Sequence, residues 1–334
     1  ITLEDLKSFR QLNSKTAGHP EYGHISGIET TTGPLGQGLG NAVGFAIAEE
    51  FIGARWGNDL CDHFTYVIAG DGCLMEGISQ EAISLAGKLK LNKLIVIWDD
   101  NGITIDGGVN LSCNTDQVSR FKSSGWSTFS CNAHNPVEID QAISNAKKDS
   151  RPSLIAAKSI IGFGSKAKQG TSGAHGAPLG KNEVEQLRNN FDWEYKEFAI
   201  PSNIKDAWEI IGKKNHKVFK DWSNQFETLP EKKKTVFLDE LNQTFPAKLT
   251  REIKSFKTYH SQKPETELAT RKASEICLDL INEYFNNTIG GSADLTGSNN
   301  TKTKSLEVFS EVNRSGRYIH YGIREHGMAA IMNG

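Results

Sequence analysis

Two short apolar runs constrain the fold of this chain more than any other feature. Residues 66–70 are apolar and end at Asp71, and residues 94–98 are apolar and end in a polar turn that contains Asn101. Runs of this length, bounded by Asp, Asn and Gly, are typical of buried strands. The apolar residues between them recur at steps of three and four, as on the inner face of an amphipathic helix. Strand, helix and strand within about 35 residues predict a right-handed βαβ unit with two parallel strands.

Neighbouring patterns extend this unit. Small and apolar residues at 35–53 predict a helix packed closely on the sheet, a further helix follows Pro136, and residues 153–157 predict a third parallel strand. Residues 161–180 form a glycine-rich loop around His175, and a loop of about twenty residues usually carries function or is disordered. We therefore expect an α/β protein with a parallel sheet flanked by helices.

The second part of the chain is more polar at first. Residues 181–260 are rich in lysine and have helical patterning, which predicts a solvated helical connector. Residues 264–285 then predict a helix and residues 287–291 a strand, so we expect the start of a second, similar α/β domain.

Composition excludes several classes of protein. The 38 Lys and Arg against 40 Asp and Glu leave a net charge of −2, which argues against a nucleic-acid or membrane-surface binder and favours small-molecule partners. The five cysteines form no CxxC pair, as expected for reduced thiols in a cytosolic protein. No apolar run reaches the roughly 20 residues of a membrane span. The chain begins at Ile1 and stops in mid-pattern at Gly334, so we expect both ends to be truncated.

The two strand ends indicate a metal and phosphate site. Asp71 and Asn101 follow neighbouring strands, and ligands of open α/β sheets bind outside those strand ends. A carboxylate, an amide oxygen and the carbonyl of Ile103 would suit Mg²⁺, while Gly72 and the amides that open the helix at Gly77 could hold a diphosphate. Alone, the Gly-Asp-Gly turn would be read as an ordinary helix start with Asp as N-cap.

Four stretches together resemble the transketolase family of thiamine-diphosphate enzymes: Thr31–Gly38, Gly70–Gly77, His175–Leu179 and Gly322–His326. The resemblance covers essentially the whole chain. It implies a thiamine-diphosphate-binding fold, with a diphosphate-binding domain over residues 1–258 that lacks its N-terminal part and includes the connector at about 181–258. Residues 259–334 would begin a truncated pyrimidine-binding domain.

The resemblance also implies a ligand set. The metal, Mg²⁺ with Ca²⁺ or Mn²⁺ as possible replacements, would be held by Asp71, Asn101 and the backbone carbonyl of Ile103. The residues expected at the cofactor, in addition to Asp71 and Asn101, are Gly33, Leu35, Gly72, Glu76, Ile105, His175, Asp294 and Glu325. Leu35 and Ile105 would pack on a bent cofactor, although ordinary core burial would explain two apolar residues equally well.

The expected catalytic residues are Glu325, His175 and Glu76. Glu325 would share a proton with the aminopyrimidine ring and so promote formation of the thiazolium ylid. Glu76 and Glu81, five residues apart on the helix after Asp71, would help to link paired active sites across a dimer. For Glu76, a carboxylate at a helix start is a competing explanation.

The expected substrate residues are His19, His175, Arg271 and Ser298. The histidines would contact sugar hydroxyls or phosphate, and Arg271 with Ser298 would hold the acceptor phosphate, since arginine offers a bidentate fork. Taken singly, either histidine would be read as a surface residue.

The activity implied by the resemblance is that of a transferase of aldehyde or ketone groups in the pentose phosphate pathway. A two-carbon ketol unit would pass from a ketose phosphate, such as xylulose 5-phosphate, to an aldose phosphate, such as ribose 5-phosphate, in a cytoplasmic homodimer with active sites between subunits. The alternatives are dihydroxyacetone synthase, deoxyxylulose-phosphate synthase, phosphoketolase, or a non-catalytic cofactor-binding paralogue.

Overall fold

The computed structural model describes residues 1–263 and 267–334. It contains two compact units. Unit 1 comprises Ile1–Ile47, His63–Lys214 and Ala329–Gly334, and unit 2 comprises Ala48–Asp62 and Asn215–Met328. Three helices therefore pass from one unit to the other: α2 (Gln37–Trp56), α8 (Ser202–Glu227) and α13 (Glu325–Asn333).

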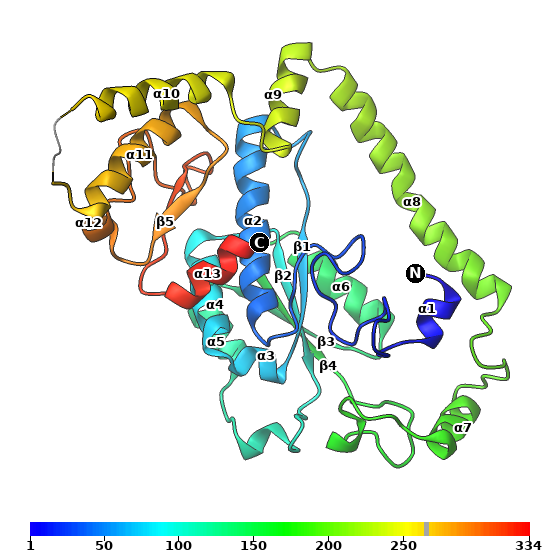
Figure 1. Ribbon diagram of the computed structural model, residues 1–334. Coiled ribbons are helices and arrows are strands. Elements are labelled where there is room, and N and C mark those ends of the chain that lie inside the picture. Colours follow the sequence, from blue (N-terminus) through cyan, green and yellow to red (C-terminus); the bar gives the residue numbers. More distant parts are fainter. Residues whose placement is uncertain (264–266) are drawn as a thin grey trace. The chain divides into compact units, whose positions relative to one another are not determined.

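Unit 1 is built on a four-stranded sheet (Figure 1). Its strands are β1 (Thr65–Gly70), β2 (Leu94–Asp100), β3 (Ser127–Asn132) and β4 (Ser153–Lys158). All pairs are parallel, in the order β1-β2-β4-β3. The parallel sheet flanked by helices is confirmed, and so are the three strands expected from apolar runs.

The edge strand β3 was not expected from the sequence. It reads Ser-Thr-Phe-Ser-Cys-Asn, with few apolar residues, and most of its side chains are not fully buried. It inserts next to β4, so β4 lies between β2 and β3 instead of at the edge. A polar strand of this kind is stabilised by its neighbour more than by its own pattern.

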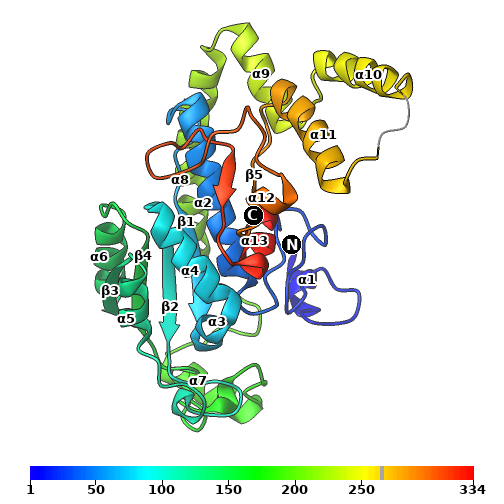
Figure 2. The same ribbon diagram turned by 90° about the vertical axis from the view of Figure 1, so that its left-hand side faces the viewer.

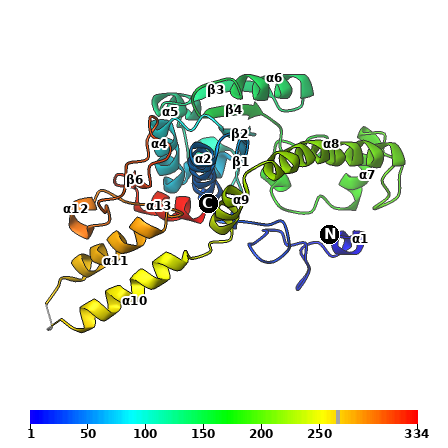
Figure 3. The same ribbon diagram turned by 90° about the horizontal axis from the view of Figure 1, so that it is seen from above.

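Helices cover both faces of this sheet: α4 (Gly77–Leu89) and α5 (Gln117–Ser123) lie on one face and α6 (Pro136–Ala146) on the other (Figures 1 and 3). On the α6 face a buried core joins Ile95, Ile155 and Cys131 to Ala142 and Ala146. The remaining elements of unit 1 are α1 (Leu3–Lys7), α3 (Asp71–Met75), the 3₁₀ turns η1 (Val109–Leu111) and η2 (Ser172–Ala174), and α7 (Lys181–Asn190).

Helix α4 packs closely on the segment before β3. Trp126 is buried and donates its indole Nε1–H to the carbonyl of Ile83 at 2.8 Å. A methyl group at Gly87 would overlap the carbonyl oxygen of Ser124. Only glycine allows this approach, which fixes the distance between α4 and the start of β3.

Unit 2 is mostly helical, with a two-stranded parallel sheet. Its elements are α9 (Glu231–Leu241), α10 (Ala247–Ser261), α11 (Thr270–Tyr284), β5 (Gly290–Ser292), α12 (Thr296–Asn299) and β6 (Tyr318–His320), with β5 paired to β6. Figure 2 shows α11, α12 and β5 of this unit from a second side. The helical structure expected over residues 181–260 is present as α7 to α10. The helix expected at 264–285 begins at Thr270, and residues 264–266 lie outside the described residues; the expected strand begins at Gly290 instead of 287.

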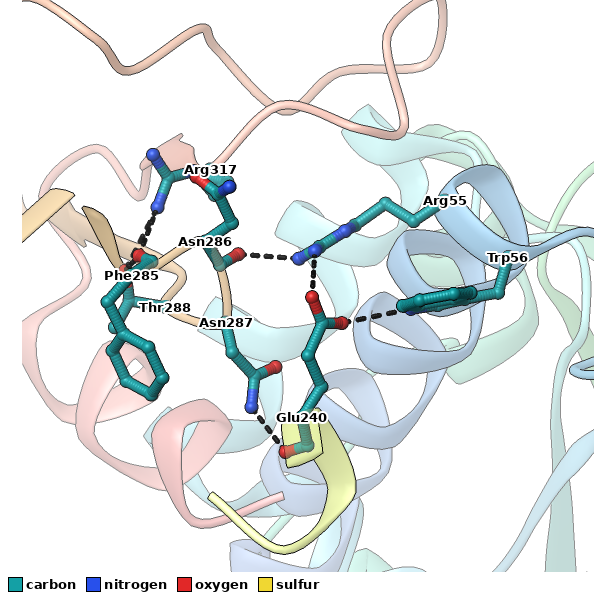
Figure 4. A network of polar contacts seen from close by, with 8 residues as sticks. All are labelled: Arg55, Trp56, Glu240, Phe285, Asn286, Asn287, Thr288 and Arg317. Atoms are coloured by element: carbon teal, nitrogen blue, oxygen red, sulfur yellow. Dashed lines mark hydrogen bonds and ion pairs between the residues drawn. The ribbon is translucent and has the colours of Figure 1, made fainter. Parts of the chain in front are cut away.

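A polar network holds the segment before β5 (Figure 4). The carboxylate of Glu240 accepts hydrogen bonds from Arg55 at 2.5 Å and from the indole of Trp56 at 2.9 Å. Arg55 also donates to the carbonyl of Asn286, and Asn287 donates to the carbonyl of Glu240. Residues 286 and 287 are thus tied to α2 and α9, just before the strand begins at Gly290.

Arg317 completes this network from the residue before β6. Its guanidinium donates to the carbonyl of Phe285 at 2.9 Å (Figure 4). It also donates to the carbonyl of Asn282 at 2.7 Å, near the C-terminal end of α11. A cation at this position satisfies carbonyls that lack a partner within the helix. Burial, together with the charge of Arg55, lowers the pKa of Arg317.

Among the described residues, no helix is long and apolar enough to span a membrane.

Candidate functional site

The carboxyl ends of β1 and β2 place Asp71 and Asn101 at the same edge of the sheet. The strand register pairs Gly70 with Asp99, and Asp71 and Asn101 each directly follow the last residue of their strand. This is the edge at which open α/β sheets bind ligands. Asp71 is the first residue of α3, with Gly70 as N-cap, so it is not the N-cap residue itself.

The carboxylate of Asp71 is buried and held by two donors. Trp98 donates its indole Nε1–H to Oδ1 at 3.1 Å, and the amide of Gly102 donates to Oδ2 at 3.0 Å. Burial raises the pKa of Asp71, and the charges of Asp100 and Asp99 raise it further. A bound cation would stabilise the ionised form of this carboxylate against its burial.

Asn101 is held at the start of a tight loop. Its Oδ1 accepts the amide of Ile103 at 2.9 Å, and its Nδ2 donates to Asp99 at 2.9 Å. Gly102 has a φ of +72°, and Ile103 bridges back to Gly108. The loop thus keeps the Ile103 backbone beside the Asn101 side chain.

The donor set at this edge fits a magnesium ion. Carboxylate, amide and backbone carbonyl oxygens are hard ligands, and Mg²⁺ usually takes few protein ligands and fills its shell with water and phosphate oxygens. Among residues 1–263 and 267–334 no cluster of three or more His, Cys, Asp or Glu side chains could hold a metal ion.

The backbone after Asp71 is open to an anion. A methyl group at Gly72 would meet only the Leu35 side chain, at 3.1 Å, and one at Gly77 would meet nothing within 4 Å. Gly77 begins α4, whose first amides and helix dipole favour a phosphate. The residues present therefore fit a diphosphate bound through a metal at the sheet edge.

The expectation that Glu76 and Glu81 lie on one helix is wrong, because Glu76 lies between α3 and α4. Its backbone is extended, with φ −62° and ψ 137°, where it ends α3 and caps α4. The extended residue breaks the helix, so Glu76 is exposed, whereas Glu81 is half-buried on α4. The two carboxylates therefore do not share a regular helical spacing.

Two apolar side chains near this edge are exposed. Leu35 is 52% and Ile105 is 74% exposed. The alternative that they are ordinary core residues is therefore wrong, because a core leucine or isoleucine would be buried. Their exposure is consistent with packing on an apolar ligand or on another surface.

The loop that precedes α2 closes one side of the site. Gly36, with a φ of +83°, faces the side chains of Ile78 and Ser79 at the start of α4. His19 is exposed and lies against Gly33: a methyl group added at Gly33 would be 3.3 Å from the Cβ of His19. A cavity of about 260 Å³ lies beside this loop, lined by residues that include Thr30, Thr32, Gly38, Ala69 and Cys73.

His175 lies in the glycine-rich loop of unit 1. It follows η2, donates its amide to the carbonyl of Ser172 at 2.9 Å and exposes its side chain. The loop is ordered by its own hydrogen bonds, such as that from Gly170 to the carbonyl of Ile161 at 2.8 Å. The expected functional loop is therefore a defined surface structure.

Four expected residues belong to unit 2, and all of them are exposed. Arg271 is the second residue of α11, Ser298 lies in α12, and Glu325 is the first residue of α13. Asp294 lies between β5 and α12 with a φ of +61°, an uncommon conformation that indicates a constrained turn. The structure thus divides the expected residues into one set in unit 1 and another in unit 2.

The partners of Asp71 were missed in the sequence. Trp98 ends an apolar run, which predicts a core residue, but its indole is also the donor that orients Asp71. The register of β1 and β2 would have found it, because Trp98 pairs with Ala69, two residues before Asp71.

The chain is similar to known proteins along nearly its whole length. Residues 1–250 match the family model described as transketolase, thiamine diphosphate binding domain, and residues 266–334 match transketolase, pyrimidine binding domain. The chain is 52% identical over 333 residues to a transketolase of Rhodobacter capsulatus, which covers 100% of this chain and 49% of that protein.

Two solved structures show the same fold. The transketolase of Leishmania mexicana matches with a TM-score of 0.91 and 38% identity, over 99% of this chain and 50% of that one. The transketolase of Pichia stipitis in complex with sedoheptulose 7-phosphate matches with a TM-score of 0.90 and 41% identity, over 100% of this chain and 51% of that one. The chain therefore spans about half the length of the relatives it matches.

Proposed function

Because the chain belongs to the transketolase family, we propose that it carries the thiamine-diphosphate site of an enzyme that moves a two-carbon ketol unit between sugar phosphates. The observation that carries this proposal is the buried carboxylate of Asp71 beside Asn101 at the carboxyl edge of the sheet. The donor would be a ketose phosphate and the acceptor an aldose phosphate.

Residues of unit 1 bind and orient the cofactor in this proposal. Asp71, Asn101 and the carbonyl of Ile103 hold a divalent cation, and the backbone at Gly72 and at the start of α4 holds the diphosphate. Exposed Leu35 and Ile105 cover the apolar part of the cofactor. When bound, thiamine diphosphate supplies a nucleophilic thiazolium carbon and stabilises the carbanion that forms next to it, which no side chain can do.

Other residues move protons and hold the sugar. The Glu325 carboxyl shares a proton with a ring nitrogen of the aminopyrimidine, which sets the protonation state of the cofactor. His19 and His175 donate to hydroxyl or phosphate oxygens near neutral pH, and Arg271 with Ser298 binds the acceptor phosphate. The sedoheptulose 7-phosphate in the complex of the Pichia stipitis transketolase supports this substrate class.

We further propose a cytoplasmic homodimer acting in the pentose phosphate pathway. Glu325 and Asp294 belong to unit 2, and in a dimer each could serve the site of the partner subunit. Glu76 and Glu81, close to the start of α4, would then lie near the subunit interface.

Glu325→Gln tests the proposal in the protein purified at its natural length. Transfer from xylulose 5-phosphate to ribose 5-phosphate should fall by about 10²- to 10⁴-fold, the usual range for a lost acid–base group. Binding of Mg²⁺ and thiamine diphosphate, measured by calorimetry, should change little. Glu283→Gln, an exposed glutamate of α11, is the matched control.

The possible outcomes test the role of Glu325 and the proposed activity separately. A Glu325→Gln variant with the wild-type rate would remove Glu325 from the chemistry. A wild-type protein that binds the cofactor but transfers no ketol unit would overturn the proposed activity itself.

A further inference from the structure

The ring of His134 holds the first residues of the loop that carries His175. His134 lies between the end of β3 and Pro136 at the start of α6. The amide of Ile160 donates to its Nε2 at 3.1 Å. Nε2 is therefore the acceptor of this bond, directed at the Ile160 amide.

The same ring also contacts the loop through an aromatic stack. His134 and Phe163 lie with ring centroids 4.1 Å apart and planes inclined by 27°. Phe163 in turn packs against Phe191 at 6.2 Å, at the end of α7. One side chain therefore fixes both the direction in which the loop leaves β4 and the first aromatic anchor within it.

The beginning of the loop is packed directly against the residues that precede His175. Gly162 has a φ of +64°, and a methyl group there would lie 2.8 Å from the Cβ of Ala174, the neighbour of His175. The amide of Gly170 donates to the carbonyl of Ile161 at 2.8 Å. A shift at Ile160 to Phe163 would therefore displace Ala174 and His175 with it.

A second contact holds the middle of the loop independently of His134. The Glu183 carboxylate, in the first turn of α7, accepts from the hydroxyl of Ser165 at 2.6 Å and from the amide of Ala167 at 3.2 Å. Loss of the His134 contact should therefore loosen the loop at its start without unfolding it.

We propose that His134 is a positioning residue for His175, acting through Ile160, Phe163 and the contact between Gly162 and Ala174. The inference rests on the proposed function in so far as His175 binds substrate. It assigns no contact between His134 and the substrate, since His134 acts through its contacts with Ile160 and Phe163.

Three variants separate the two contacts of His134. His134→Ala removes both. His134→Phe keeps an aromatic ring for Phe163 but loses the acceptor, and His134→Gln keeps an acceptor for the Ile160 amide but loses the ring. His216→Phe, an exposed histidine on α8, is the control for a histidine-to-phenylalanine change.

The first measurement is amide hydrogen exchange of the unliganded protein, followed by mass spectrometry. Loss of the hydrogen bond should speed exchange of residues 160–163 and 174–175 about fivefold in His134→Phe. The increase should be larger in His134→Ala, which also loses the ring stack, smaller in His134→Gln, and absent in His216→Phe. Exchange in β2 should remain at the wild-type rate in all variants. Unchanged exchange of the loop in His134→Ala would overturn the proposal.

The second measurement is steady-state transfer by the protein at its natural length. We expect His134→Ala and His134→Phe to raise KM for the ketose phosphate about fivefold while kcat changes less than about twofold, and His134→Gln to restore most of the loss. An unchanged KM, or equal losses in all three variants together with a lower unfolding temperature, would overturn the positioning role. If the wild type shows no transfer, the proposed function fails, whereas the exchange result still decides whether His134 holds the loop.

Discussion

Replacing Asp71 by Asn should change ligand binding far more than it changes stability. The amide is the same size, but one of the two donors, Trp98 Nε1–H or the Gly102 amide, would then face an NH₂ group. An unsatisfied buried donor costs about 1–3 kcal/mol. Against this, burial already raises the pKa of Asp71, so a neutral side chain avoids the cost of the buried charge. Because the two effects oppose each other, we expect the free energy of unfolding without ligand to change by no more than about 2 kcal/mol.

The effect on ligand binding has no such compensation. With free ligand at 100 times its dissociation constant, binding stabilises the native protein by about 2.7 kcal/mol. Loss of an outer partner of a metal site alone weakens metal binding by about 10- to 100-fold, so loss of a ligand should weaken it at least 100-fold. At the same concentration the variant would then gain only about 0.4 kcal/mol.

Urea unfolding of the purified protein with and without Mg²⁺ and thiamine diphosphate measures both quantities. Asp149→Asn is the matched control, because Asp149 pairs with Arg151 just before β4. It therefore lies at the amino ends of the parallel strands, away from Asp71 at their carboxyl ends. The control should keep the full stabilisation by ligand. An Asp71→Asn variant that also keeps it would refute the assignment of Asp71 as a ligand, and a loss well above 3 kcal/mol without ligand would refute the compensation argument.

Three further changes test packing, burial and substrate binding. Gly87→Ala should destabilise the protein by about 1–3 kcal/mol in urea unfolding, because the added methyl group overlaps the Ser124 carbonyl. Gly212→Ala, where the methyl group would meet no atom within 4 Å, should stabilise the protein by about 0.5–1 kcal/mol. Changes of the same sign in the two variants would contradict the packing argument. Burial raises the pKa of Tyr321 to about 12 from 10.0, so the folded state keeps a proton that the unfolded chain releases above pH 10. The free energy of unfolding should therefore fall as the pH rises from 10 towards 12. Between pH 10 and pH 11 it should fall by about 1 kcal/mol more in the wild type than in Tyr321→Phe. Parallel pH curves for the two proteins would contradict the burial argument. Arg271→Ala should raise KM about 10- to 100-fold for a phosphorylated aldose acceptor and much less for an unphosphorylated one, and an equal rise in steady-state assays would remove Arg271 from the phosphate site.

The sequence alone determined the central βαβ unit and its polar strand ends. Apolar runs, helical periodicity and the turns at Asp71 and Asn101 are local signals, and parallel strands joined by a helix must end at the same edge. The edge of the sheet that fits a metal and a diphosphate could therefore be predicted before any contact was known.

Several features of the site depended on contacts between distant segments. Strand β3 has no apolar pattern of its own, so only its pairing with β4 shows it. The donors that hold the Asp71 carboxylate, Trp98 and Gly102, come from residues about thirty positions away. The exposure of Leu35 and Ile105 is likewise a property of the folded surface, since apolar character alone favours burial.

The link between His134 and His175 shows the same division most clearly. The glycine-rich loop and its histidine were visible in the sequence, but the sequence could not reveal that the His134 ring accepts the Ile160 amide and stacks on Phe163. Local patterns determine which residues carry a polar group, because they depend on neighbours along the chain. Tertiary packing decides which of those groups meet and which stay exposed, because it depends on segments that the chain brings together only when it folds.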